Sequence, residues 1–477
     1  METQMTSNLS VDLSNSQRIH VVGVGGPGMS AIARVLYEMG NIVSGSDIKD
    51  SIAVQRLKDL GVVINVGHDA DVVSGCDVVT ASTAIPQSNI EMLAAHSCGI
   101  PVLTRAQILA AICAQKTAIG VAGTHGKTTT SSMLMTVLKS SGADPSFIIG
   151  GDVHGEGTGA SWDSGQYLVV EADESDGTHE HLPLFGTIVT NIDVDHLDHF
   201  STFDNVVASF DRYLAAIQGP KVVCADDERL GLMSLQHHAI TYGLNRSAHY
   251  GASNIQFVNG GSKFDVIYRE GSQLEGVLLG QVQLRVRGMH NVSNALGVIA
   301  MALTLGIDFA VVVNSLAGFS GVARRFDIRG VDAGVTFVDD YAHLPAEISA
   351  VLSSSKDASD AWSRIVAVFQ PNRFNRMQHM SDSYADSFIL ADHVVITDIY
   401  ASGTTPIPGV TGKLVVDAIL EQHPDASIVW KPTRAELIDH LAQNLRPGDL
   451  CISMGCGDIE LLPDEVMAAR IVMRSAP

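Results

Sequence analysis

The feature that most constrains the fold is the stretch Gly-Thr-His-Gly-Lys-Thr-Thr-Thr at positions 123–130. An apolar run, Thr117–Ala122, precedes it, and a helical pattern beginning at Ser131 follows it. A strand, a glycine turn and a helix start together form a cradle for anions, because backbone N–H groups and the positive end of the helix dipole point to the same place. The stretch therefore predicts an ATP-binding phosphate loop.

Two residues of this loop have expected roles. Lys127 is placed to reach the β- and γ-phosphates of ATP, and the Thr128 hydroxyl is placed to bind Mg²⁺. The strict pattern G-x-x-x-x-G-K-[ST] is not met, because Val121 stands where its first glycine belongs. Gly123 instead gives a shorter loop than the standard one.

Carboxylates follow two apolar runs downstream of the loop. Residues 167–174 end in acids, of which Glu171 is the first, and residues 187–192 are followed by a segment rich in aspartate that contains His196. Acids at the carboxyl ends of parallel strands beside a phosphate loop are suited to a nucleotide-bound Mg²⁺. Glu171 is therefore a candidate ligand, and His196 is either a ligand of a second cation or a structural residue.

Composition limits the class of protein. The 477 residues are too many for one core, and 44 glycines with few aromatic side chains are typical of α/β proteins. The formal net charge of −22 argues against a nucleic-acid-binding or anionic-membrane-binding surface. The cysteines form no C-x-x-C pair, which favours a reducing cytosol over a zinc site or a disulfide framework. Neither a signal peptide nor an apolar run of about 18 residues is found, so we expect an intracellular chain outside the membrane.

A second glycine-rich turn lies near the N-terminus. Gly23-x-Gly25-x-x-Gly28 follows an apolar strand pattern, and Asp47 ends the next strand pattern. This arrangement matches the dinucleotide-binding fingerprint, in which the acid binds a ribose hydroxyl. The residues alone leave two ligands open, NAD and the pyrophosphate of a UDP-sugar, since the same physics serves any pyrophosphate.

Two further groups precede the last third of the chain. Asn291 and Asn294 share one face of a predicted helix and suit an adenine edge or a ribose, although the residues alone favour simple helix capping. Arg324 and Arg325 are adjacent in a glycine-flanked linker. They suit phosphate contact across a domain hinge, with ordinary surface salt bridges as the alternative.

Polar side chains also follow two predicted strands of the last third. Tyr341 and His343 come just after a strand that ends in two acids, and Arg373 and Arg376 follow the next strand. Arginine binds a carboxylate through two parallel hydrogen bonds, so these residues suit a small zwitterion. Phosphate contact and surface salt bridges remain the alternatives.

Taken together, these motifs resemble the Mur ligases of cytoplasmic peptidoglycan synthesis, and most closely the branch that adds L-alanine to UDP-N-acetylmuramate (UDP-MurNAc). The motifs that carry the resemblance are GVGGPGMSAIA, GTHGKTTT, EADESDG, TNIDVDHLDHF, GMHNVSNA, RRFD, DDYAHLP and QPNRFNR. They span most of the chain, and their joint occurrence is very specific. The resemblance replaces the NAD interpretation of the first glycine turn.

The resemblance implies three α/β domains. Residues 1–114 would form a Rossmann-like domain that binds UDP-MurNAc, and residues 115–321 a central ATP-binding domain of the P-loop type. Short β-like runs in residues 245–285 indicate a small antiparallel insertion in that domain. Residues 322–477 would form a second Rossmann-like domain, which binds the amino acid.

The resemblance also assigns residues to each ligand. The UDP-MurNAc site would comprise Gly25, Gly26, Gly28, Met29, Ser30, Asp47, His68 and Ser82. ATP would be bound by Gly123, Thr124, His125, Gly126, Lys127, Thr128, Thr129, Asn291, Asn294 and Arg325. Mg²⁺ would be held by Thr128, Glu171 and His196, and L-alanine by Tyr341, His343, Arg373 and Arg376. The catalytic set would be Lys127, Glu171, His196 and Arg325.

The implied enzyme is an ATP-dependent amide ligase of the cytoplasm, monomeric or homodimeric, that uses ATP and Mg²⁺ and forms an acyl-phosphate intermediate. Leu344, Asn372 and Phe374 stand where the family pattern has His, His and Tyr, which leaves selectivity for L-alanine over glycine or L-serine open. Three alternatives are a recycling ligase that adds an intact tripeptide, a nicotinamide-dependent oxidoreductase, and a non-catalytic ATP-binding partner of another ligase. The second leaves the phosphate loop unexplained.

Overall fold

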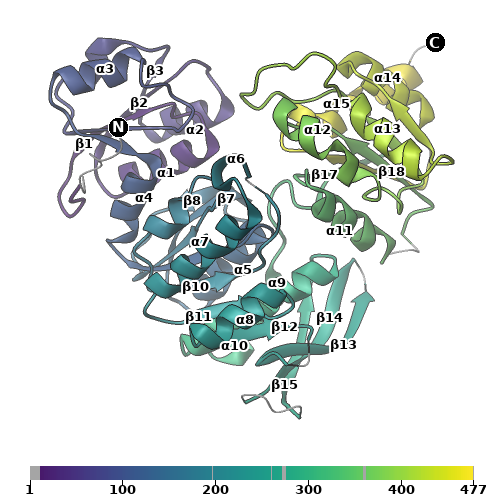
Figure 1. Cartoon of the computed structure of the whole chain (residues 1–477), viewed down its shortest axis with the longest axis horizontal. Coiled ribbons are helices and arrows are strands. Elements are labelled where there is room, and N and C mark those ends of the chain that lie inside the picture. Colours follow the sequence, from purple (N-terminus) through teal and green to yellow (C-terminus); the bar gives the residue numbers. More distant parts are fainter. Residues whose placement is uncertain are drawn as a thin grey trace. The chain divides into compact units, whose positions relative to one another are not determined.

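The computed structural model describes residues 11–195, 197–245, 247–258, 260–270, 275–357 and 361–475. Within these ranges the chain forms three sheets of mainly parallel strands joined by helices (Figure 1). The chain divides into two compact units. The first contains residues up to 254, 264–282 and 293–319, and the second contains 255–263, 283–292 and the residues from 320 onward. The α/β fold class is confirmed, and the exact domain boundaries stay predictions.

The first sheet has five strands in the order β3-β2-β1-β4-β5, and all its pairs are parallel. Helix α1 begins at Pro27, because a proline at the first helical position has no N–H to leave unsatisfied. The elements are β1 (Arg18–Val22), α1 (Pro27–Glu38), β2 (Ile42–Asp47), α2 (Ile52–Leu60), β3 (Val63–Val66), β4 (Val78–Ala81), α3 (Ile90–Ser97), β5 (Val102–Thr104) and α4 (Arg105–Cys113).

The second sheet has ten strands in the order β15-β14-β13-β12-β11-β10-β6-β9-β7-β8. The elements before the insertion are β6 (Thr117–Ala122), α5 (Lys127–Ser140), β7 (Ser146–Val153), β8 (Thr158–Ser161), β9 (Tyr167–Glu171), β10 (Gly186–Val189), α6 (Leu197–Phe200), α7 (Phe203–Ala216), β11 (Lys221–Cys224), α8 (Glu228–Gln236) and β12 (Ile240–Gly243). Two long helices follow the insertion, α9 (Met289–Thr304) and α10 (Phe309–Gly318).

The predicted insertion consists of β13 (Tyr250–Val258), β14 (Gly261–Tyr268) and β15 (Val277–Leu284). These three strands are neighbours in the sheet, and their connections are too short for the crossover that parallel neighbours need. They are therefore antiparallel to one another, as expected. They do not form a separate sheet, because β13 pairs with β12 and so extends the edge of the parallel sheet.

The third sheet has six strands in the order β16-β17-β21-β18-β19-β20, of which only the β16–β17 pair is antiparallel. The elements are β16 (Asp327–Asp332), β17 (Val335–Asp340), α11 (Pro345–Lys356), β18 (Arg364–Phe369), α12 (Phe374–Met380), β19 (His393–Ile396), α13 (Lys413–Gln422), β20 (Ile428–Trp430), α14 (Arg434–Asn444), β21 (Asp449–Met454) and α15 (Leu462–Ser475).

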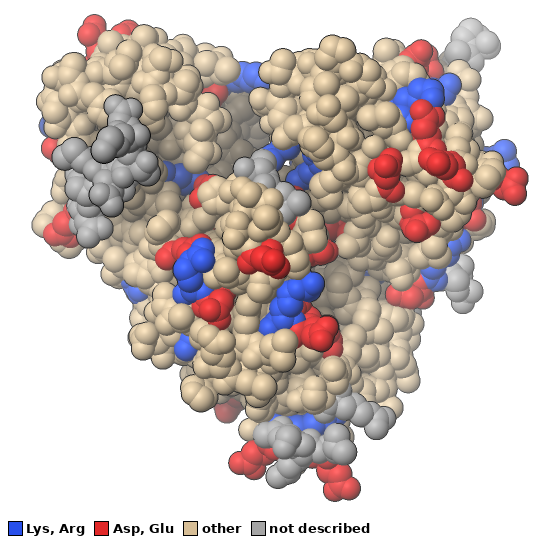
Figure 2. All heavy atoms as spheres, viewed as in Figure 1, with Lys and Arg blue, Asp and Glu red and all other residues tan. Residues whose placement is uncertain are grey.

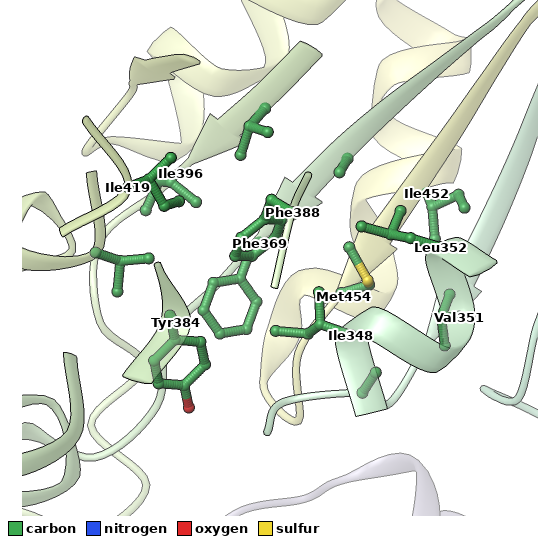
Figure 3. Packing of buried hydrophobic residues seen from close by; sticks show 14 of the residues in the cluster. Ile348, Val351, Leu352, Phe369, Tyr384, Phe388, Ile396, Ile419, Ile452 and Met454 are labelled. Atoms are coloured by element: carbon green, nitrogen blue, oxygen red, sulfur yellow. The ribbon is translucent and has the colours of Figure 1, made fainter. Parts of the chain in front are cut away.

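Alternate residues of β18 pack on opposite faces of this sheet, as the pleat of a strand requires. Phe369 lies in a core that also contains Tyr384 and Phe388, whose rings are centred 5.5 and 5.6 Å from its own (Figure 3). Val366 and Val368 belong to the core of the other face. A strand buried on both sides reads as a continuous apolar run, which is why β18 is recognisable in the sequence.

Charged side chains of both signs lie on one face of the molecule. On the face drawn in Figure 2, acidic and basic side chains are interspersed, and no broad basic patch is seen. Within the described residues, no helix is both long enough and apolar enough to cross a membrane.

Candidate active site

The phosphate loop joins β6 to α5 and is braced by the residues that follow β10. Gly123 and Gly126 have φ values of +119° and +86°, which favour glycine. A Cβ at Gly123 would also overlap Thr190 Oγ1. The backbone N–H of His125 donates to Asn191 Oδ1 at 2.9 Å, and Asn191 Nδ2 donates to His125 O at 3.0 Å. Helix α5 begins at Lys127 rather than at Ser131, so its N-terminus opens directly onto the loop.

The ammonium group of Lys127 is held by hydrogen bonds to the phosphate loop and to Glu174. Its Nζ donates to Gly123 O at 2.7 Å and to both carboxylate oxygens of Glu174 at 2.9 Å. The Glu174 side chain is 1% exposed. Burial acts to lower the pKa of Lys127, but the charges of Glu174 and Asp173 outweigh it and the pKa is raised. The lysine is therefore a fixed cation at the N-terminus of α5.

The predicted magnesium ligands are partly brought together. Glu171 ends β9, which pairs with β6 beside the loop, and Thr128 is buried in the first turn of α5. Glu171 interacts electrostatically with Lys127. A hydroxyl and a carboxylate are oxygen ligands of the kind that Mg²⁺ prefers, so these two residues fit the ion. The third predicted ligand, His196, lies outside the described residues, and within those residues no group of three His, Cys, Asp or Glu side chains could hold a metal.

The two asparagines of α9 are placed differently. Asn294 is buried next to the phosphate loop, because a Cβ at Gly126 would lie 2.8 Å from Asn294 Oδ1. Asn291 donates from Nδ2 to Arg287 O at 2.6 Å, a local bond at the start of the helix. Asn294 thus lies at the predicted ATP site, whereas Asn291 donates to a backbone carbonyl four residues earlier, which is not the N-cap contact, because an N-cap side chain accepts a backbone N–H.

The predicted UDP-MurNAc residues gather at the carboxyl ends of the first sheet. Asp47 ends β2, and its Oδ2 accepts the backbone N–H of Gly25 at 2.9 Å. A Cβ at Gly23, in the glycine turn, would lie 3.2 Å from Ser82 Cβ, which follows β4. His68 follows β3. The Met29 side chain is 2% exposed and packs in the core, so only its backbone can contact a ligand.

A pocket of about 220 Å³ opens beside this glycine turn. One wall comes from the turn and from α1 and α2, and the other from β7 and β8. Its lining includes Pro27, Ser30, Arg34, Arg56, Gly150 and Gly151. The N–H of Gly150 donates to Glu171 Oε1 at 2.7 Å. The wall of the pocket and the carboxylate beside the phosphate loop are therefore joined by one hydrogen bond.

The four residues predicted to bind the amino acid follow β17 and β18. The rings of Tyr341 and His343 are centred 5.5 Å apart, and His343 Nδ1 lies 3.3 Å from Glu347 Oε2. Arg376 Nη1 donates to Asn372 Oδ1 at 3.1 Å. Arg373 has a φ of +60°, an unusual value for a side chain other than glycine.

The Cys456 thiol interacts electrostatically both with Tyr341 and with Arg373 and Arg376. Burial raises the pKa of Cys456, while the charges of Arg376, Arg324 and Arg373 oppose that shift. Tyr341 in turn interacts electrostatically with Cys456. The phenol and both predicted carboxylate-binding arginines are therefore grouped around one side chain, at the carboxyl edge of the third sheet.

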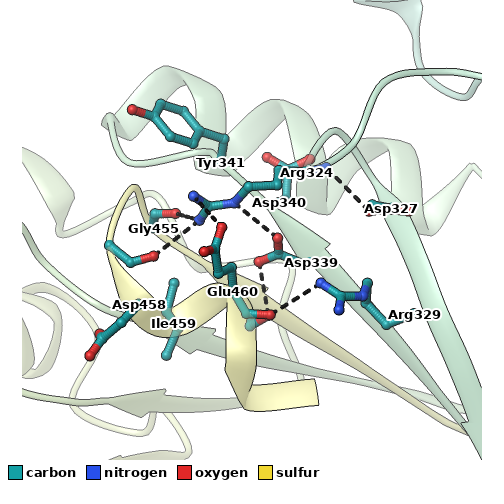
Figure 4. Close-up of polar contacts among 12 residues, drawn as sticks. Arg324, Asp327, Arg329, Asp339, Asp340, Tyr341, Gly455, Asp458, Ile459 and Glu460 are labelled. Atoms are coloured by element: carbon teal, nitrogen blue, oxygen red, sulfur yellow. Dashed lines mark hydrogen bonds and ion pairs between the residues drawn. The ribbon is translucent and has the colours of Figure 1, made fainter. Parts of the chain in front are cut away.

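Arg324 and Arg325 are adjacent in the linker, and Arg324 binds the third sheet through several polar contacts. Arg324 donates from Nε to Asp339 Oδ2 at 3.1 Å and from Nη2 to Gly455 O at 2.8 Å, and its Nη1 pairs with Glu460 at 2.9 Å (Figure 4). It fastens the linker to the third sheet. Both guanidinium groups lie near the Tyr341 ring, that of Arg324 at 5.0 Å and that of Arg325 at 5.1 Å from the ring centre. Of the two arginines, only Arg325 is predicted to bind ATP. The polar contacts of Arg324 give that residue a structural role.

Three family models match consecutive parts of the chain. They are described as the Mur ligase family catalytic domain, the Mur ligase middle domain, and the Mur ligase glutamate ligase domain, and they match residues 18–117, 121–302 and 324–457. A UDP-N-acetylmuramate–L-alanine ligase of Pelotomaculum thermopropionicum is 40% identical over 452 residues, which are 94% of this chain and 96% of that protein. The chain belongs to the Mur ligase family.

Solved structures agree with this assignment. The UDP-N-acetylmuramate–alanine ligase MurC of Thermotoga maritima superposes on this Mur ligase with a TM-score of 0.79 at 28% identity, covering 96% of this chain and 99% of that one. A murein peptide ligase of Psychrobacter arcticus superposes with a TM-score of 0.70 at 24% identity, covering 95% and 99%. At that identity the second similarity shows the fold alone.

Sequence reasoning missed three residues that organise the site of this Mur ligase. Glu174 binds Lys127, Asn191 braces the phosphate loop, and Asn372 holds Arg376. A signal existed for the first two, since Glu174 lies in the same acidic strand end as Glu171 and Asn191 directly follows a strand beside the loop. Asn372 was seen only as a departure from the family pattern.

Proposed function

We propose that this Mur ligase joins L-alanine to UDP-MurNAc, using ATP and producing UDP-MurNAc-L-alanine, ADP and phosphate in the cytoplasm. The observation that carries the proposal is the hydrogen bond between Gly150 N–H and Glu171 Oε1. It links the pocket beside the glycine turn to the carboxylate beside the phosphate loop. A sugar nucleotide bound along that pocket would bring its lactyl carboxylate to the γ-phosphate of ATP.

The reaction needs two steps, because a carboxylate is too poor an electrophile for an amine at neutral pH. The lactyl carboxylate attacks the γ-phosphorus, which gives an acyl phosphate and ADP. The uncharged amine of L-alanine then attacks the acyl carbon, and phosphate leaves. Lys127 and the N–H groups of the loop would stabilise negative charge on the phosphoryl oxygens. Mg²⁺ held by Thr128 and Glu171 would neutralise further charge on the phosphates.

The third sheet would supply the amino-acid site. Arg373 and Arg376 would bind the carboxylate of L-alanine through their planar guanidinium groups. His343 would receive the amine, and its ring is held by Nδ1, which lies 3.3 Å from Glu347 Oε2 and 3.1 Å from the Tyr341 carbonyl oxygen. Tyr341 would cover the small methyl side chain.

Phosphate release from Mg·ATP tests this proposal when each component is omitted in turn. We expect release only when UDP-MurNAc and L-alanine are both present. Release with L-Ala-D-Glu-meso-diaminopimelate in place of L-alanine would instead assign the protein to the recycling branch. Failure with both amines, in a protein that still binds ATP, would contradict the enzymatic assignment.

A further inference from the structure

A buried carboxylate lies under the predicted UDP-MurNAc site. Glu91, on α3, is 0% exposed. Its Oε2 accepts a hydrogen bond from Ser46 Oγ at 2.5 Å and lies 3.3 Å from His68 Nδ1. Its Oε1 accepts the backbone N–H of Asp69 at 3.1 Å. This carboxylate has no part in the proposed ATP, magnesium or amino-acid sites.

A second histidine completes the cluster. His20, in β1, is fully buried, and its Nε2 lies 3.5 Å from Glu91 Oε2, while its Nδ1 lies 2.9 Å from Ser44 Oγ. Burial acts to raise the pKa of Glu91, but hydrogen bonds from His20, Ser46 and Asp69 lower it to about 2. Glu91 is therefore ionised at neutral pH and can only accept hydrogen bonds.

The position of the hydrogen on His68 follows from counting donors. The single hydroxyl hydrogen of Ser46 points to Glu91, so Ser46 Oγ can only accept from His68 Nδ1, which lies 3.3 Å away. Both polar neighbours of His68 Nδ1 are thus acceptors. The hydrogen of the neutral ring must be on Nδ1, which leaves a lone pair on Nε2. The His68 side chain is 18% exposed, so that lone pair can meet a ligand.

We propose that Glu91 is a positioning residue for UDP-MurNAc: it fixes the ring and the tautomer of His68, so that Nε2 accepts a hydrogen bond from an N–H or O–H group of the uridine. This inference rests on the proposed function, because His68 is expected to contact the UDP part of that substrate. A fixed acceptor favours a donor-bearing ligand such as uracil or ribose, and it disfavours a bare phosphate oxygen.

Glu91→Gln tests the proposal in the full-length enzyme. The amide can donate as well as accept, so His68 is no longer held in one tautomer. We expect the KM for UDP-MurNAc to rise about tenfold, as for the loss of one well-placed hydrogen bond, with kcat and the KM values for ATP and L-alanine unchanged. Glu436→Gln makes the same change at an exposed position in the first turn of α14 and is the matched control.

A double-mutant cycle separates positioning from simple structural support. If Glu91 acts through His68, then Glu91→Gln with His68→Ala binds UDP-MurNAc no more weakly than His68→Ala alone. Additive losses, or a uniform decline in all kinetic constants, would overturn the proposal. The same double-mutant cycle can be measured by calorimetric titration with UDP, which requires no turnover. The result therefore remains interpretable even if the protein has no ligase activity.

The tautomer can also be observed in the unmodified protein. ¹⁵N NMR of histidine-labelled full-length enzyme, with His68→Gln used to assign the signal, distinguishes the two ring nitrogens. We expect a protonated Nδ1 and an Nε2 signal that shifts when UDP is added. A proton on Nε2 in the neutral ring would contradict the proposal even if Glu91→Gln failed to fold.

Discussion

Asn372 shows how one side chain sets the direction of another. It is 3% exposed, and its amide oxygen accepts a hydrogen bond from Arg376. A neighbouring backbone bond, from Arg373 N to Tyr400 O at 2.9 Å, keeps Arg373 at its positive φ. Such strain persists only where the surrounding structure holds it. The histidine of the family pattern is thus replaced here by an amide that still has an acceptor for arginine.

Removing that acceptor is expected to weaken amino-acid binding. Asn372→Ala should raise the KM for L-alanine about tenfold, because the Arg376 guanidinium loses one of the hydrogen bonds that orient it. The KM for ATP should change little. Steady-state kinetics with varied L-alanine measure the effect, and Asn444→Ala, on α14, is the control. An unchanged KM for L-alanine would remove Arg376 from the proposed site.

The ion pair of Lys127 with Glu174 is expected to stabilise the fold as well as the site. Glu174→Gln leaves an ammonium group that is only 14% exposed beside a neutral amide. Breaking a buried pair from one side costs about 3 kcal/mol. Chemical denaturation without added nucleotide should show that loss, and ATP-dependent phosphate release should fall with it. Equal stability of variant and wild type would mean that the pair is readily replaced by water.

Asp340 is expected to make stability depend on pH. Burial raises the pKa of Asp340 to about 6, from an ordinary value of 3.8, although Arg325 acts in the opposite direction. A raised carboxyl pKa means that the folded state binds the proton more tightly, so this stabilisation is present below pH 3.8 and is lost as the pH rises through 6.

The comparison of Asp340→Asn with wild type isolates this effect. Between pH 5 and pH 7.5 the stability of the variant relative to wild type should improve by on the order of 1 kcal/mol. Thermal unfolding at the two pH values measures it, and the exposed Asp425→Asn serves as the reference. A relative stability that does not change with pH would mean that Asp340 titrates normally.

At the scale of elements, β18 is one of the strands that pack into both cores of the third sheet. Its odd-numbered residues Ile365, Ala367 and Phe369 pack on one face, and Val366 and Val368 pack on the other. The strand also leads directly into Arg373. Packing faults in β18 are therefore transmitted to the amino-acid site.

Phe369→Ala tests the contribution of this strand. The ring is fully buried between Tyr384 and Phe388, so its removal should lower the free energy of unfolding by about 3–5 kcal/mol. Val331→Ala, at a position 67% exposed on β16, should change it by less than about 0.5 kcal/mol. Urea denaturation followed by fluorescence measures both. Similar values for the two variants would contradict the packing seen in Figure 3.

Strands with continuous apolar runs were predictable from the sequence, and β6 has the predicted bounds Thr117–Ala122. Six strands were not predicted, namely β7, β8, β11, β12, β16 and β20. β16 contains Gly330 and alternates polar and apolar residues, and β20 has only three residues, so tertiary pairing rather than local pattern determines both. The start of α5 was misplaced at Ser131 instead of Lys127, because a glycine turn hides the first helical residues.

The sequence predicted which residue types the candidate site contains, but not which of those side chains pair with one another. Glu171 interacts electrostatically with Lys127, and Asn294 lies next to Gly126 of the phosphate loop, while their roles stay predictions. The acidic strand end signalled a partner for Lys127 but not that Glu174 is that partner, since several acids could serve and the fold decides which is buried. The same holds for Arg324, whose ion pair with Asp339 the sequence did not indicate.

At the scale of the whole molecule, the phosphate loop and the third sheet belong to different compact units. A ligand that binds one unit stabilises that unit by mass action. Mg·ATP at about one hundred times its dissociation constant should raise the unfolding transition of the unit carrying the loop by about 5 °C. Scanning calorimetry measures the shift, and a chelator should reduce it. An equal shift of every transition would mean that the units unfold as one.

The pairing of Lys127 with Glu174 also has a consequence for product release. Any anion entering the loop competes with a carboxylate that already holds the lysine by two hydrogen bonds. A single inorganic phosphate, which is a product of the proposed reaction and abundant in cells, offers few additional contacts to offset that competition. A triphosphate that spans the whole loop offers many more. The loop is thereby protected against retention of its own product.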